Sequence, residues 1–127
     1  MTTLLASFGP AKSDSAWTQE CLSVAGFDKI KNLIAGDIAG VPVPKDDSVL
    51  TRKAIDQYSK RLLGLSNQHI EECAERARHR ESPSHQGVIL LGMGRERSYC
   101  LRRICQLGWA SILIIDSELA EALAAER

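Results

Sequence analysis

Two short apolar runs near the C-terminus constrain the fold more than any other feature of the chain. Residues 87–92 read GVILLG and residues 110–116 read ASILIID, and both runs are rich in β-branched side chains. Such runs are too short for buried helices, and without polar alternation they are typical of strands buried on both faces. A helical pattern, RERSYCLRRICQLG, separates them, and another, ELAEALAAER, follows Ser117 as its cap. Residues 87–127 are therefore predicted to form a βαβα unit in which residues 88–92 and 111–115 are adjacent parallel strands.

The preceding part of the chain shows helical periodicity. Capping residues at 13–15 precede AWTQECLSVAG, and FDKIKNLIAGDIAG continues at helical spacing, so residues 1–40 are predicted to be an N-terminal helical segment. Residues 2–8 could add a strand to the sheet. The sequence VPVP at 41–44 is expected to be an extended connector, because each proline restricts itself and its predecessor.

Residues 46–80 are predicted to form a helical hairpin. Asp46–Ser48 would cap its first helix, Ser66 would cap its second, and Gly64 lies at the turn between them. The first helix has an apolar face made of Val49, Leu50, Ala54, Ile55, Tyr58, Leu62 and Leu63. Together these patterns predict a small α/β domain over residues 1–127, with N-terminal helices before a short parallel sheet.

Composition excludes several classes of protein. The 127 residues contain 16 basic and 16 acidic side chains, so the chain lacks the basic coat of many nucleic-acid binders. No apolar run approaches the ~20 residues of a membrane span, and the start has no basic segment typical of a secretion signal. With four cysteines and no such signal, we expect a cytoplasmic protein with reduced thiols. Charge is uneven, however, because residues 52–103 carry eleven bases against six acids.

The turn after the first apolar run carries the most specific motif. Gly92 and Gly94 follow that run and precede a helix, and Asp116 ends the second run. These residues resemble the fingerprint of dinucleotide-binding (Rossmann) domains, over about 30 of the 127 residues. The resemblance implies a nucleotide site in which Gly92 permits the tight turn and Gly94 lets the backbone approach a pyrophosphate. Ser98 would lie at the helix start that favours the phosphates, and Asp116 would accept hydrogen bonds from ribose hydroxyls. The third glycine of the fingerprint is replaced by Arg97, which would either contact a phosphate or fill its pocket.

Two other interpretations remain open. In the first, the glycines serve turn geometry alone. In the second, residues 49–80 form a helix-turn-helix that binds DNA, with side chains suited to base edges and phosphates on the second helix: Asn67, Gln68, Arg76, Arg78 and Arg80.

Catalysis and metal binding find little support in the sequence. His69 and Cys73 have the i, i+4 spacing of a metal clamp, but no Cys-x-x-Cys accompanies them. Cys73 and Cys105 are interpreted as small core residues, and Cys100 near a helix start as a position that favours a thiolate. No nucleophile with an ordered base is present, so we expect neither a catalytic centre nor a metal site.

These observations predict a non-catalytic binding or regulatory module. It would recognise a phosphate-bearing ligand or a protein partner at the Gly92–Arg97 loop. The alternatives are the DNA-binding regulator described above and a structural subunit of a larger assembly. A homo-oligomer or a protein partner is expected in any case, because a parallel sheet this small leaves apolar surface that needs a cover.

Overall fold

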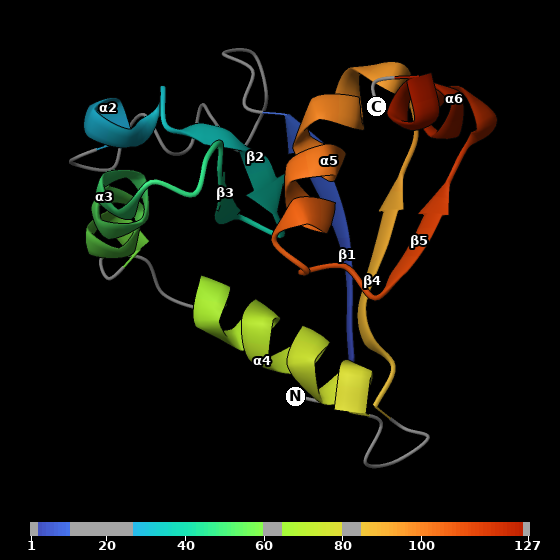
Figure 1. Cartoon of the computed structure of the whole chain (residues 1–127), viewed down its shortest axis with the longest axis horizontal. Coiled ribbons are helices and arrows are strands. Elements are labelled where there is room, and N and C mark those ends of the chain that lie inside the picture. The colour runs from blue at the N-terminus through green and yellow to red at the C-terminus, as the bar shows by residue number, and fades with distance from the viewer. Residues whose placement is uncertain (1–2, 11–26, 60–64, 80–84, 126–127) are drawn as a thin grey trace.

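The computed structural model describes residues 3–10, 27–59, 65–79 and 85–125 (Figure 1). Its strands are β1 (Thr3–Pro10), β2 (Ile34–Ile38), β3 (Val41–Pro44), β4 (Gly87–Gly92) and β5 (Ile112–Ile115). Its α-helices are α2 (Phe27–Ile30), α3 (Val49–Ser59), α4 (Asn67–His79), α5 (Ser98–Gln106) and α6 (Ser117–Ala125), and a 3-10 turn, η1 (Arg95–Arg97), precedes α5.

The strands form one mixed sheet in the order β3-β2-β1-β4-β5. The half that contains β1, β4 and β5 is parallel, with Leu5 opposite Ile89 and Ile89 opposite Ile112. The other half is an antiparallel hairpin, β2–β3, that pairs with the end of β1. The predicted βαβα unit is therefore confirmed: β4 and β5 are adjacent and parallel, α5 connects them, and α6 follows.

The prediction of N-terminal helices before the sheet is wrong in the described residues. The first element is the strand β1, and the helical pattern from Phe27 to Gly40 yields only the four-residue α2 before β2 begins. Buried β2 residues pair with β1 and β3, so tertiary pairing outweighs the local helical spacing. The expected helix over residues 13–26 lies outside the described residues.

The segment Val41–Pro44 is also more than a connector, since it forms the edge strand β3. Proline is tolerated in an edge strand because that strand needs hydrogen bonds on one side only. All four of its residues are buried.

The helices of residues 46–80 are present, but their apolar faces lie in different clusters. Ile55 and Tyr58 of α3 pack with α2 and Ile34, whereas Ile70 and Cys73 of α4 pack against the sheet. Polar contacts link the two helices, with Arg52 to Glu71 at 2.7 Å and Asn67 to Asp56 at 3.0 Å. The buried face of α3 is also rotated from the predicted one, because Val49 and Leu50 are 80% and 79% exposed.

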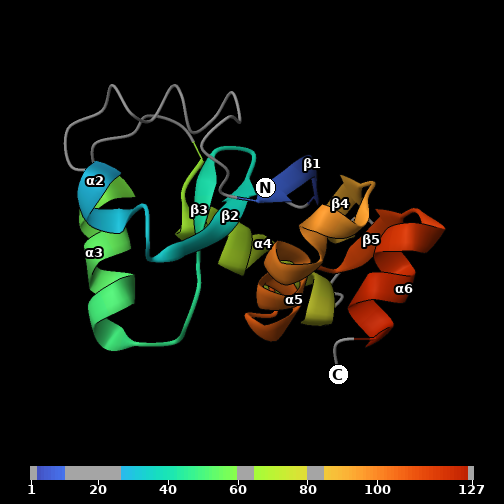
Figure 2. The ribbon, with the colours of Figure 1, turned by 90° about the horizontal axis from the view of Figure 1, so that it is seen from above.

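The main core lies on one side of the parallel strands. Ala6, Val88 and Leu90 point to the side on which Ile70 of α4 and Leu101 of α5 pack, and α6 adds Leu119 to the same cluster. Figure 2, seen from above, shows α5 and α6 on the same side of β4 and β5. Within the part of the chain that the structure describes, no helix covers the opposite side of these strands.

Candidate functional site

The Gly92–Arg97 loop lies at the carboxyl end of the parallel strands, where ligands bind in open α/β sheets. A cavity of about 550 Å³ opens there, within the range of ligand pockets. We call it the loop hollow. It is lined by strand ends and by the loop: Ser7, Phe8, Leu91, Gly92, Met93, Arg97, Ile114, Ile115 and Asp116. Three of the predicted site residues, Gly92, Arg97 and Asp116, therefore lie around one cavity.

The packing and backbone geometry of the fold explain why glycine occurs at both positions of the loop. A Cβ on Gly92 would lie 2.6 Å from the ring of Phe8, so glycine gives this ring its space against β4. Gly94 has φ of +97°, which favours glycine, and a Cβ there would lie 2.5 Å from a carboxylate oxygen of Glu96. The glycines thus allow a close packing contact and a turn, without requiring a phosphate.

Arg97 is held by groups of the protein itself. Its Nε donates to the carbonyl oxygen of Phe8 at 3.2 Å, and its Nη1 donates to Glu96 at 2.9 Å and also to the carbonyl of Met93. These contacts fasten the loop to the end of β1. The guanidinium therefore lines the loop hollow while it is bonded to groups of the same chain.

Asp116 is similarly engaged. Its Oδ1 accepts from the backbone N–H of Leu119 at 3.1 Å, as an N-cap of α6, and from the N–H of Gly94 at 3.2 Å. The cap of α6 is therefore Asp116 and not the predicted Ser117. The resemblance places a pyrophosphate beside the backbone of Gly94, but the N–H of this residue already has a carboxylate partner. Ser98 is buried at the first position of α5.

The loop hollow continues onto an uncovered apolar surface. Side chains alternate across a strand, and the register places six of them on the side away from the helices: Leu5, Ser7, Ile89, Leu91, Ile112 and Ile114. We call this surface the open face. Leu5 is 64% exposed, Leu91 39%, Ile112 42% and Ile114 53%, and Met93 beside them is 70% exposed. The prediction that β4 and β5 are buried on both faces is therefore wrong within the described residues, because α4, α5 and α6 all pack on one side.

The sequence predicted that the sheet leaves apolar surface in need of a cover, but it did not identify the open face or its residues. Residues 88–91 and 112–115 are all apolar, so no alternation distinguishes the covered side from the uncovered one. The only signal was indirect, namely that a parallel sheet requires a layer on each face.

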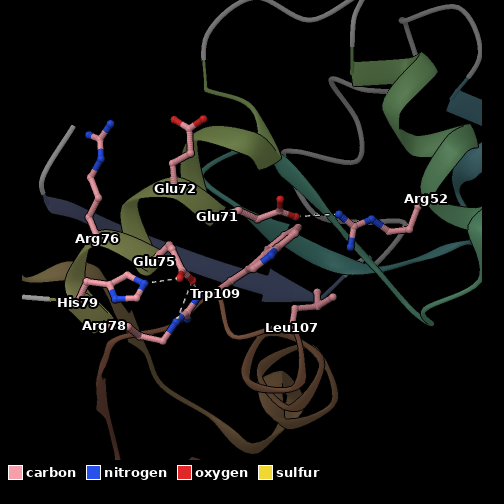
Figure 3. A pocket seen from close by; sticks show the side chains of 9 residues that line it. All are labelled: Arg52, Glu71, Glu72, Glu75, Arg76, Arg78, His79, Leu107 and Trp109. Carbon is pink, nitrogen blue, oxygen red and sulfur yellow. Dashed lines mark hydrogen bonds and ion pairs between the residues drawn. The ribbon is translucent and has the colours of Figure 1, made fainter.

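A second cavity, of about 600 Å³, lies between α4 and the residues that follow α5 (Figure 3). We call it the Trp109 groove. It is lined by Arg52, Glu71, Glu72, Glu75, Arg76, Arg78, His79, Leu107 and Trp109. Trp109 is buried, and the guanidinium of Arg52 lies 5.9 Å from its ring centroid.

Ion pairs line much of the Trp109 groove. Arg52 pairs with Glu71, and Glu75 accepts from both Arg78 and His79 (Figure 3). The hydrogen bond from Arg78, followed by that from His79, lowers the pKa of Glu75. Arg78 also donates to the carbonyl of Gly108 at 2.8 Å. These cations are therefore largely matched by acids of the same chain.

Two further residues of the DNA-binding interpretation form hydrogen bonds with acidic side chains of the same chain. Asn67 donates to Asp56, and Gln68 donates to Glu72 at 3.1 Å. Arg76 is exposed on α4, whereas Arg80 lies outside the described residues. α4 packs on the sheet through Ile70, Cys73 and Ala74, with its charged side outward.

The three cysteines among the described residues lack the features of a reactive centre. Cys100 is buried, and burial together with the neighbouring Asp37 raises the pKa of its thiol to about 12, which corrects the expectation of a thiolate. Cys73 is buried as predicted, but Cys105 is exposed and not part of the core. Among the described residues, no cluster of three or more His, Cys, Asp or Glu side chains could hold a metal ion. None of the helices in the described ranges is long and apolar enough to cross a membrane.

Comparison with known proteins gives no independent assignment. The chain matches no protein-family model, and searches of curated proteins and of solved structures found none similar to it. The geometry of the loop hollow and of the open face is therefore the basis of a functional proposal.

Proposed function

We propose that this protein is a non-catalytic binding module that engages a protein partner through the open face and the adjoining Gly92–Arg97 loop. The single observation that carries the proposal is the exposure of Leu5, Leu91, Ile112 and Ile114 on neighbouring parallel strands. Parallel sheets are found with both faces covered, and a contiguous exposed apolar patch marks an interaction site.

The chemistry of the loop supports a protein partner over a phosphate. A phosphate would need N–H groups and cations, but the N–H of Gly94 and the guanidinium of Arg97 bind within the protein. Two carboxylates, Glu96 and Asp116, also lie beside the loop and would repel an anion. The hollow instead presents Phe8, Leu91, Met93, Ile114 and Ile115, which suit an apolar side chain.

Two leucines, one on the open face and one elsewhere on the surface, allow a controlled test of partner binding. Leu91→Lys places a charge on the open face, and Leu50→Lys places the same charge on an exposed leucine of α3. Each variant and the wild-type protein would serve as bait, and each retained protein would be purified and titrated against all three. We expect a partner that binds wild type and Leu50→Lys but binds Leu91→Lys at least about tenfold more weakly, because a lysine charge would be buried at the contact.

The alternatives give different results in parallel titrations. Mononucleotides, dinucleotides and mixed-sequence duplex DNA would each be titrated into wild type, Gly94→Val and the double variant Arg76→Ala/Arg78→Ala. Nucleotide binding that Gly94→Val abolishes would replace our proposal with a phosphate site. If wild type binds duplex DNA in a salt-sensitive manner and the double variant does not, DNA recognition would replace our proposal.

A further inference from the structure

The structure leads us to propose that the occupant of the open face is a second copy of this chain, which packs face to face as a symmetric dimer. The inference rests on the proposed function, since it names the partner of the same surface. In such a dimer the two parallel sheets lie about 10 Å apart with their side chains interdigitated. Each copy then supplies the missing layer of the other.

Charge favours a second copy. None of the six open-face side chains is ionisable, and the whole chain has equal numbers of basic and acidic residues. A twofold axis brings each surface against an identical one, so any charge near the axis would face a like charge. A face without charges meets this requirement for self-complementarity.

The burial pattern of the strands gives an independent argument. Val88–Leu91 and Ile112–Ile115 are continuous apolar runs, which is the composition of strands covered on both faces. The described residues of one copy cover the side of Val88 and Leu90, whereas Leu91 and Ile114 on the other side are exposed. The composition and the structure agree once a second copy packs on the open face.

The primary test measures mass against concentration. Sedimentation equilibrium from low micromolar to submillimolar protein would compare wild type, Leu5→Lys, Ile114→Lys and the control Leu50→Lys. We expect reversible dimers for wild type and the control, and dimer dissociation constants at least about tenfold higher for both open-face variants. Circular dichroism and thermal melting at the lowest concentration would verify that each variant is folded.

A mixing experiment separates loss of a contact from loss of the fold. Leu5→Lys and Leu5→Glu are each expected to be monomeric, because each would bury an unpaired charge in the apolar contact. An equimolar mixture is expected to form a one-to-one heterodimer, visible by native mass spectrometry, because opposite charges then meet. Such a heterodimer can form only if the open face of one copy contacts the open face of the other.

Two results would overturn the inference. One is a wild-type monomer over the whole concentration range. The other is a dimer that both open-face variants retain as well as Leu50→Lys does, since this dimer would use another surface, such as the edge of β5. If wild type is monomeric but a different protein passes the Leu91→Lys test above, the second-copy inference fails and the proposed function stands. If wild type is monomeric and no other protein passes that test, both the second-copy inference and the proposed function fail.

Discussion

The turn between β2 and β3 shows how single residues set local geometry. Ala39 and Gly40 have φ of +50° and +85°, so both occupy the left-handed region, as in the turns that join tight hairpins. Gly40 adopts this conformation without strain and donates its N–H to Asp37 at 2.9 Å. Ala39 does not, because a Cβ in this region contacts its own backbone.

A substitution at Ala39 is therefore expected to increase stability. Ala39→Asn should raise the free energy of unfolding by about 0.5–1 kcal/mol, because asparagine tolerates the left-handed region. Ala39→Val should lower it, because a β-branched side chain is disfavoured there. Urea denaturation of both variants would test this expectation. Equal stabilities would show that the turn has another conformation in solution.

Asp37 gives stability a defined pH dependence. Burial raises its pKa above 3.8, although the hydrogen bond from Gly40 opposes this shift. The folded state therefore binds this proton more tightly than the unfolded state, and stability is lost as pH rises from 3.8 through the raised pKa. Asp37→Asn retains an acceptor for Gly40 without the charge. We expect it to be more stable than wild type at neutral pH, by a margin that shrinks towards pH 3.8 in denaturation curves. A constant margin would contradict this assignment.

At the scale of elements, the ends of α5 and α6 were only partly predictable. Gly108 ends α5 as predicted: it has φ of +72°, and the N–H of Trp109 donates to the carbonyl of Ile104 at 3.1 Å. The sequence suggested Ser117 as the cap of α6, but Asp116 directly precedes it and takes that role. Both are common capping residues, so the sequence alone could not separate them.

The cap assignment gives a prediction with a matched control. Asp116→Ala should destabilise the protein by about 1–2 kcal/mol, because Leu119 loses its capping acceptor and Gly94 loses its partner. Ser117→Ala should change the unfolding free energy by less than about 0.5 kcal/mol, because Ser117 is exposed. Thermal denaturation of both variants would decide the question. A larger effect at Ser117 would reverse the assignment.

Other element-scale features follow from pairing that no local pattern encodes. The β4–α5–β5 unit was predictable, because its strands and helix differ in length and in periodicity. The strand β2 was not, because Ile34 and Ile38 fit helical spacing equally well and only pairing with β1 and β3 decides between helix and strand. The structural role of Arg103 was also not predictable from the sequence. It is buried on α5 and donates to the carbonyl of Pro44 at 3.0 Å, a contact made across 59 residues of sequence.

At the scale of the whole molecule, α4, α5 and α6 pack on one side of the parallel strands, and within the described residues no helix covers the other side. The sequence predicted the location of the candidate loop, since Gly92, Arg97 and Asp116 surround one cavity. It did not predict how these groups are used, because Arg97 binds the carbonyl of Phe8, which lies 89 residues earlier in the chain. The open face depends on strand order and register, which composition does not specify.

Self-association should also make stability depend on protein concentration. A dimer that forms only from folded chains raises the midpoint of unfolding as concentration rises. We expect the melting temperature of wild type to increase with concentration and that of Ile114→Lys to stay constant. Scanning calorimetry over the range used for sedimentation would measure both. An equal increase in the two proteins would place the association elsewhere.

We propose that the chain covers one side of β4 and a second copy covers the other, and two adjacent residues distinguish the two sides. Leu90 is buried and Leu91 is exposed, so Leu90→Cys and Leu91→Cys report on opposite sides of one strand. Each variant would be treated with a thiol reagent at low and high protein concentration, and the label would be located by peptide mass spectrometry. We predict that position 91 reacts in dilute solution and is protected at high concentration, whereas position 90 is protected at both. Equal reactivity of the two positions, or a position 91 that is protected even in dilute monomer, would contradict the account.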